Sequence, residues 1–169
     1  ANVMNFEQIP IFLYIQDKLD EALKFVSDNK QMVCLDGTYS CLKSDRLKLL
    51  ENGFYQSFQY NEAIELVELS LSRSEDELSL EGEDLGVKEQ AYYRLGMINM
   101  KWGEHKEAIE GFSNALKINE NYITSRGDSL FWNSHYKKRL GLTYNLMGEY
   151  KKASQYYYKS YKQESKIDE

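Results

Sequence analysis

The sequence predicts an all-α protein built from repeated antiparallel helix pairs, and three observations lead to this prediction. Two stretches of the chain align without gaps at a constant offset of 45 residues. Proline is nearly absent, since Pro10 is the only one in 169 residues, and the ten glycines are few for a turn-rich β protein. Tyrosine is abundant, at fourteen residues, and its apolar ring and hydrated hydroxyl suit half-buried seams between helices.

The repeat is clearest between residues 91–121 and residues 136–163. A weaker copy lies one offset earlier, at 44–73, and a partial copy lies at about 3–30. The matched pairs of the two best copies are Leu95-Gly96 with Leu140-Gly141, Gly103-Glu104-His105 with Gly148-Glu149-Tyr150, Ala108 with Ala153, Phe112 with Tyr157, and Ala115 with Ser160.

These matched residues resemble the tetratricopeptide repeat, with Leu-Gly in a first helix, Gly-acidic-aromatic at the turn, and Ala with an aromatic in a second helix. The resemblance implies a single domain over residues 1–169, a right-handed superhelical solenoid of antiparallel helix pairs with about seven or eight helices. Its repeats are expected at about 3–30, 44–73, 89–121 and 134–165. The family repeat spans about 34 residues, so the longer offset implies longer helices or loops. The spacing alone also suits HEAT repeats, but the Gly-Ala-aromatic set favours the tetratricopeptide repeat.

Each matched residue has a packing role in this prediction. Gly96 and Gly141 lack side chains, so neighbouring helices can approach there, and Phe112 and Tyr157 are expected in the core. Gly103 and Gly148 are expected to end first helices in a left-handed conformation, whereas the weaker copy has Phe58 at this position. The predicted helices lie near 10–16, 18–30, 43–57, 59–73, 87–102, 104–118, 128–147 and 149–165. Residues 74–85 and 119–127 are expected to be loops, and residues 31–42 stay open apart from a turn at Gly37-Thr38.

Charge and cysteine usage exclude several classes of function. The net charge of −6 argues against a nucleic-acid surface, although residues 134–169 carry eight basic and four acidic side chains. Cys34 and Cys41 are too few for a disulfide scaffold, so we expect reduced thiols in a cytoplasmic protein. No segment approaches the roughly 20 apolar residues of a membrane span, and no signal peptide is visible. Because the chain begins with Ala1 rather than Met, we expect it to be part of a longer protein.

No catalytic, cofactor or metal-binding motif is recognisable, so the sequence predicts a protein that is not an enzyme. His105 occupies a turn position that tyrosines fill in the other copies, which favours a structural role. An enzyme acting as a phosphatase-like regulator of a signalling protein is the least favoured alternative. The expected function is recognition of a protein or short peptide, without direct nucleic-acid or membrane binding.

In the tetratricopeptide family the first helices line the concave surface of the solenoid. Carried over by alignment, this predicts a mixed cationic, amide and aromatic surface suited to a peptide with a carboxylate, because Arg binds carboxylates through two hydrogen bonds. The expected contact residues are Lys48, Asn52, Tyr55, Gln90, Tyr93, Arg94, Met97, His135, Lys138, Arg139 and Asn145. In the cluster Tyr156, Tyr157, Tyr158 and Tyr161, Tyr157 is expected to face the core, whereas Tyr156 and Tyr158 point elsewhere. An exposed aromatic patch on the flank of this last helix is expected to bind a further repeat, a twin subunit or another domain.

Two binding functions therefore stay open. The first is a peptide-binding module, whose stretched repeats are similar in style to the sensor halves of peptide-responsive transcriptional regulators of Gram-positive bacteria. The alternative is an assembly scaffold that forms a homodimer or docks a neighbouring catalytic or signalling domain. Fold alone does not decide between them.

Overall fold

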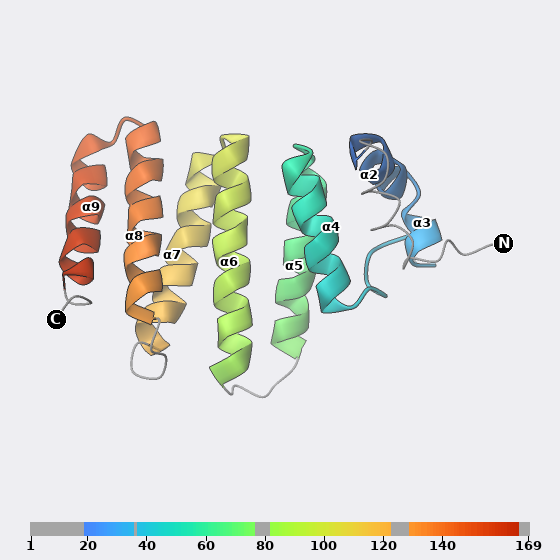
Figure 1. The fold of residues 1–169 in the computed structure, drawn as a ribbon, viewed down its shortest axis with the longest axis horizontal. Coiled ribbons are helices and arrows are strands. Elements are labelled where there is room, and N and C mark those ends of the chain that lie inside the picture. Colours follow the sequence, from blue (N-terminus) through green and yellow to red (C-terminus); the bar gives the residue numbers. More distant parts are fainter. Residues whose placement is uncertain (1–18, 36, 77–81, 123–128, 166–169) are drawn as a thin grey trace. The chain divides into compact units, whose positions relative to one another are not determined.

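The computed structural model describes residues 19–35, 37–76, 82–122 and 129–165, and in these ranges all regular structure is α-helical (Figure 1). The chain forms two compact units, Ala1–Arg73 and Ser74–Glu169. The prediction of an all-α fold is confirmed. The helices are α2 (Leu19–Asp28), α3 (Lys30–Val33), α4 (Ser44–Gln56), α5 (Tyr60–Asp76), α6 (Gly82–Trp102), α7 (His105–Tyr122), α8 (Ser129–Leu146) and α9 (Tyr150–Glu164).

The first unit has its core where α2, α4 and α5 bring together fully buried apolar side chains. Leu23 of α2 faces Gly53 of α4, where an added Cβ would lie 3.2 Å from the leucine side chain. Phe54 is fully buried and its ring centroid lies 6.3 Å from that of Tyr39. Removing such side chains from water is the main stabilising contribution here. The other fully buried apolar residues of this unit include Ala63, Leu66 and Val67.

Polar contacts tie α2 and α3 to α5 within the same unit. Ser27 Oγ donates a hydrogen bond to Glu62 Oε1 at 3.0 Å, and Lys30 forms an ion pair with Glu65. Instead of the single helix predicted for residues 18–30, the chain turns at Asn29, whose side-chain amide donates to the carbonyl of Phe25 at 2.8 Å. The predicted helix 10–16 lies outside the described residues.

Cys34 and Cys41 form a disulfide, so the expectation of reduced thiols is wrong. Their Cα atoms lie 5.7 Å apart, and the short α3 together with a turn at Gly37 brings them together. The open region 31–42 thus becomes a closed loop that leads into α4. Sequence spacing alone indicated no such contact, because the pairing depends on the helix and turn that fold between the two cysteines.

In the second unit, α6, α7, α8 and α9 follow one another as antiparallel neighbours (Figure 1). The ring of Phe112 on α7 packs over Gly96 on α6, where an added Cβ would lie 2.5 Å from the ring. At Gly111 the two helix backbones approach each other directly, since a Cβ there would lie 2.6 Å from the backbone nitrogen of Gly96. The predicted close approach at Gly96 is therefore confirmed. Phe112 is buried against Ala108 and against Leu140 of α8.

Helices extend into both predicted loops. In the acidic stretch 74–85, α5 continues to Asp76 and α6 already begins at Gly82. After the best repeat, α7 continues to Tyr122 instead of ending near residue 118. The offset of 45 residues is thus produced by long helices, with α6 spanning 21 residues and α7 spanning 18. Of the two alternatives left open by the sequence, longer helices or longer loops, the described residues show longer helices.

The turns between paired helices use a left-handed residue at equivalent positions. Gly103 and Gly148 have φ angles of 95° and 75°, as predicted for glycines that end a helix. Phe58 takes the same position between α4 and α5 with φ of 60°. An L-residue in this region has its Cβ close to a carbonyl oxygen, which costs roughly 1–2 kcal/mol. The side chain of Phe58 is 68% exposed, so burial offsets little of this cost.

We expect Phe58→Gly to raise the free energy of unfolding of the first unit by about 0.5–1 kcal/mol, since glycine adopts positive φ without this strain. Chemical denaturation followed by circular dichroism measures the change. Phe58→Ala is the matched control, because it removes the exposed ring but keeps the strained backbone. Equal stabilisation by Ala and Gly would contradict the explanation.

Reduction of the Cys34–Cys41 disulfide is expected to lower the stability of the first unit. The two residues are 7 positions apart. Closing a loop of this size lowers the conformational entropy of the unfolded chain, which stabilises the folded state by about 2–3 kcal/mol in the loop-entropy model. Denaturation with and without dithiothreitol measures the loss. The double variant Cys34→Ser/Cys41→Ser is the control, since its stability must not respond to dithiothreitol.

Candidate functional site

A buried carboxylate joins three helices of the second unit. Glu89 of α6 is 2% exposed, and its Oε1 accepts hydrogen bonds from Asn119 Nδ2 at 3.0 Å and from the hydroxyl of Tyr136 at 2.7 Å. These partners lie on α7 and α8, so one side chain holds the register of all three helices. A buried charge with such partners is stable only while they stay in place.

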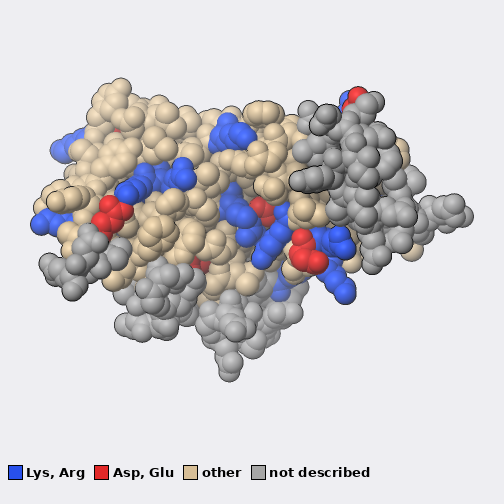
Figure 2. Space-filling model, in the orientation of Figure 1, with Lys and Arg blue, Asp and Glu red and all other residues tan. Residues whose placement is uncertain are grey.

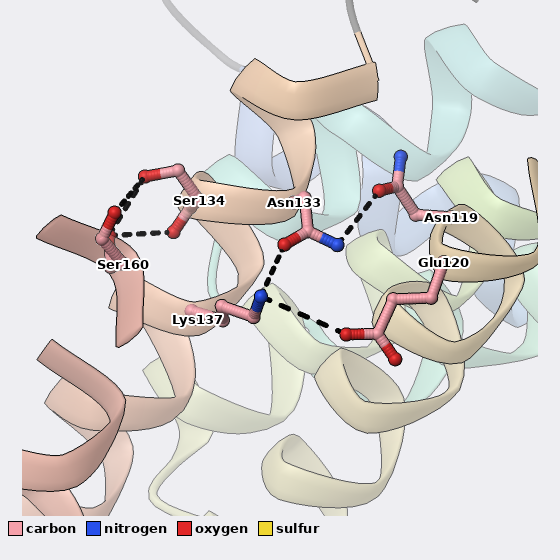
Figure 3. A network of polar contacts seen from close by, with 6 residues as sticks. All are labelled: Asn119, Glu120, Asn133, Ser134, Lys137 and Ser160. Atoms are coloured by element: carbon pink, nitrogen blue, oxygen red, sulfur yellow. Dashed lines mark hydrogen bonds and ion pairs between the residues drawn. The ribbon is translucent and has the colours of Figure 1, made fainter. Parts of the chain in front are cut away.

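The network continues from α7 into α8 (Figure 3). Asn133 Nδ2 donates to Asn119 Oδ1 at 3.2 Å, and Asn133 Oδ1 accepts from the ammonium group of Lys137. Lys137 in turn lies 3.8 Å from a carboxylate oxygen of Glu120. Each amide thus donates on one side and accepts on the other, which fixes the orientation of both side chains.

A second polar contact joins α8 to α9. The hydroxyls of Ser134 and Ser160 lie 2.8 Å apart, and both residues are buried (Figure 3). Ser134 Oγ also lies 2.8 Å from Glu164 Oε1, which forms an ion pair with Lys138. The hydrogen bonds from Lys138 and Ser134 lower the pKa of Glu164. The ammonium group of Lys138 is therefore already paired within the chain.

These contacts place an aromatic cluster, defined as Tyr93, Phe131, Trp132, His135 and Tyr136, between α6 and α8. The ring of Tyr93 lies 6.1 Å from that of Trp132 and 5.5 Å from those of His135 and Tyr136. The cluster runs from a fully buried member, Tyr136, through half-buried rings to Phe131, which is 58% exposed. Phe131 stacks on His135 with an interplanar angle of 19°. The outer rings thus form an apolar surface that is rigidly supported from below.

His135 is held as a neutral ring within this cluster. Its Nε2 lies 2.9 Å from the hydroxyl of Tyr93 and 3.4 Å from Nε of Arg139. Because Arg139 can only donate, Nε2 acts as the acceptor, which assigns the proton to Nδ1. Burial, followed by the positive charges of Arg139 and Lys138, lowers the pKa of His135. The ring therefore presents an uncharged polar edge at neutral pH.

The surface around the cluster is cationic. Helix α8 contains Lys137, Lys138 and Arg139 and no acidic residue. No carboxylate among the described residues forms an ion pair with Arg139. In Figure 2, Lys and Arg atoms over α6 and α8 lie among uncharged atoms and outnumber those of Asp and Glu. A half-buried guanidinium beside apolar rings is suited to bind an anion.

The structure brings together part of the predicted site. Tyr93, His135 and Arg139, which come from two of the predicted first helices, lie in direct contact. Arg94 lies half-buried on the same helix as Tyr93, Met97 packs against the core around Phe112, and the remaining residues are spread more widely. The predicted residues outside this group are half-buried Gln90, paired Lys138 and exposed Asn145 in the second unit, with exposed Lys48, exposed Asn52 and half-buried Tyr55 on α4 of the first unit.

Sequence reasoning missed Phe131, Trp132 and Tyr136 as members of the site. The signal was present, since Phe131 lies four residues before His135 and therefore on the same helix face. The expected repeat begins at residue 134, so the first turn of the helix predicted near 128–147 lies outside it. No sequence pattern indicated the buried hydrogen bond between Tyr136 and Glu89, because it depends on how three helices pack.

The described ranges contain neither a metal-ligand cluster nor a membrane-spanning helix. These residues contain no group of three His, Cys, Asp or Glu side chains placed to hold a metal ion. None of their helices has both the length and the apolar character required to span a bilayer.

Comparison with known proteins identifies the repeats. Models of the tetratricopeptide repeat match residues 89–122 and 139–166, so the chain contains two such repeats, formed by α6–α7 and by α8–α9. The structure is similar to the crystal structure of MamA, with a TM-score of 0.57 and 19% identity over 96% of this chain and 88% of that chain. At this identity the likeness shows a shared fold alone. A comparison with curated proteins gave no significant match. Tetratricopeptide repeats are protein-interaction modules, and the predicted helical solenoid of this type is confirmed.

Glu89 is expected to be the most sensitive residue of the polar network. Glu89→Ala leaves Asn119 and the hydroxyl of Tyr136 buried without this acceptor, which should lower the free energy of unfolding by about 2–4 kcal/mol. Glu89→Gln should lower the free energy of unfolding by less, because its amide oxygen still accepts both hydrogen bonds.

Glu120→Ala is the surface control for this series, and we expect it to change stability by less than about 0.5 kcal/mol. Thermal unfolding monitored by near-ultraviolet circular dichroism reports both the stability and the packing of the aromatic cluster. A loss on Glu89→Ala no larger than that of Glu120→Ala would contradict the assigned role.

Proposed function

We propose that the second unit binds a peptide carrying a carboxylate next to an apolar side chain, on the surface formed by the aromatic cluster and Arg139. The observation that carries the proposal is that a guanidinium with no carboxylate partner among the described residues touches His135 at the edge of this cluster. Exposed aromatic rings supply contact area at low entropic cost, and Arg supplies a charge-assisted hydrogen bond.

The geometry favours a peptide over a small anion alone. Phe131 is 58% exposed, and Tyr93, Trp132 and His135 extend the surface from α8 to α6. A surface of this kind contacts side chains of a bound segment in the way that interface hot spots do. The uncharged His135 adds a hydrogen-bonding edge beside the guanidinium and does not repel a cationic residue of the peptide.

A role as the sensor part of a peptide-responsive regulator stays a prediction, and it requires this peptide-binding activity. The assembly scaffold is the second candidate, and it is supported by exposed tyrosines on α9 rather than by the aromatic cluster. The two functions use different surfaces, so substitutions in one surface distinguish peptide binding from assembly.

The proposal is tested with a library of short peptides that end in an aromatic residue, each made with a free C-terminal carboxylate and with a C-terminal amide. We expect the free acids to bind roughly tenfold more tightly than the amides, because one charge-assisted hydrogen bond contributes about 1.5–3 kcal/mol. Isothermal titration calorimetry measures the affinities. Arg139→Gln should remove the difference between acid and amide.

Lys138→Gln is the matched control, since the ammonium group of Lys138 is already paired with Glu164. It should change the affinity by less than about threefold, as surface ion pairs contribute little. Phe131→Ala should weaken acid and amide equally, because the ring contacts the apolar side chain. Equal affinity of acids and amides for the unaltered protein would show that Arg139 does not bind a carboxylate.

A further inference from the structure

Helix α9 carries a row of exposed tyrosines that the aromatic cluster does not include. The tyrosine face is defined as Tyr150, Tyr157, Tyr158 and Tyr161, whose exposed fractions are 69%, 40%, 61% and 66%. Three of them, Tyr150, Tyr157 and Tyr161, recur at intervals of seven and four residues and therefore lie on one side of the helix. Four large exposed rings on one short helix form an apolar patch that is uncommon on a free surface.

The internal repeat indicates which kind of surface this side of α9 forms. At the offset of 45 residues, Tyr157 corresponds to Phe112 of α7 and Tyr161 corresponds to Leu116. On α7 these positions are covered by α8, since Phe112 is fully buried against Leu140 and Leu116 packs against the same group. The same side of α9 thus has the residue pattern of a helix-binding surface.

The sequence prediction that Tyr157 lies in the core is corrected by the same comparison. The ring packs over Gly141, where an added Cβ would lie 2.9 Å away, as Phe112 packs over Gly96. Only the inner side of the ring is covered, so 40% of Tyr157 stays exposed while Phe112 is fully buried. The difference arises because no described helix follows α9, whereas α8 follows α7.

The charges beside the tyrosine face indicate the chemistry of what covers it. Helix α9 contains Lys151, Lys152, Lys159 and Lys162 but only one acidic residue, Glu164, which is paired with Lys138. Helical periodicity places Lys151 and Lys162 next to the tyrosines, and the ammonium group of Lys162 lies 5.7 Å from the ring centroid of Tyr158. Two copies of α9 packed against each other would bring these lysines together, which is unfavourable.

We propose that the tyrosine face of α9 binds an amphipathic helix of a partner protein, in the way that α8 covers α7. The partner helix has apolar residues spaced by four positions, as Tyr136 and Leu140 are on α8, and acidic residues on its flanks. The apolar residues cover Tyr157 and Tyr161, and the acidic flanks pair with Lys151 and Lys162. This binding surface is separate from Arg139 and the aromatic cluster.

The probe is a stapled helical peptide with the sequence of residues 129–146, in which Lys137, Lys138 and Arg139 are replaced by Glu. The control peptide is the same helix with these three residues unchanged. Fluorescence anisotropy with the full chain should show roughly tenfold tighter binding of the acidic peptide, with affinity that falls as salt is added. Tyr161→Ala combined with Tyr158→Ala should weaken binding by roughly tenfold or more.

Both substituted tyrosines are more than half exposed, so the double variant should fold normally, which circular dichroism verifies. Arg139→Gln is the second control and should leave binding of the acidic helix unchanged, so the two surfaces are tested independently. Failure of the acidic helix to bind, equal binding of both helices, or binding unaffected by the tyrosine variants overturns the proposal. Sedimentation of the full chain as a dimer that the double tyrosine variant dissociates would assign the tyrosine face to a second copy instead.

Discussion

The buried carboxylate of Glu89 is the interaction on which the arrangement of the second unit depends. It accepts hydrogen bonds from Asn119 on α7 and Tyr136 on α8, so a single group relates three helices. Apolar contacts have no preferred direction, whereas a buried carboxylate loses its hydrogen-bond partners when a helix shifts. The position of Tyr136, and with it the aromatic cluster on α8, follows from this constraint.

Glycines set the distance at which these hydrogen bonds are possible. Gly96 and Gly111 bring the backbones of α6 and α7 together, which leaves the ring of Phe112 over Gly96. The same arrangement recurs where Tyr157 packs over Gly141. The glycine contacts fix the separation of the helices, and the buried hydrogen bonds of Glu89 fix their register.

The two helix pairs of the second unit share a pattern but differ in surroundings. Phe112 lies between two helices and is fully buried, whereas Tyr157 is covered on one side. The corresponding side of α9 carries exposed tyrosines with neighbouring lysines. Arg139 and the exposed tyrosines accordingly give one chain two surfaces of different chemistry.

The residue pattern alone determined the class of fold, the two later repeats and the left-handed turns at Gly103 and Gly148, because packing and turn chemistry act locally and repeat along the chain. It also named Tyr93, His135 and Arg139 among the expected contact residues, whose binding role stays a prediction. Only the tertiary structure decided that these three meet, that Lys138 is paired with Glu164, and that Cys34 and Cys41 are joined. Each of these contacts depends on the distance between side chains after helices have packed, and a sequence read along one dimension does not contain that distance.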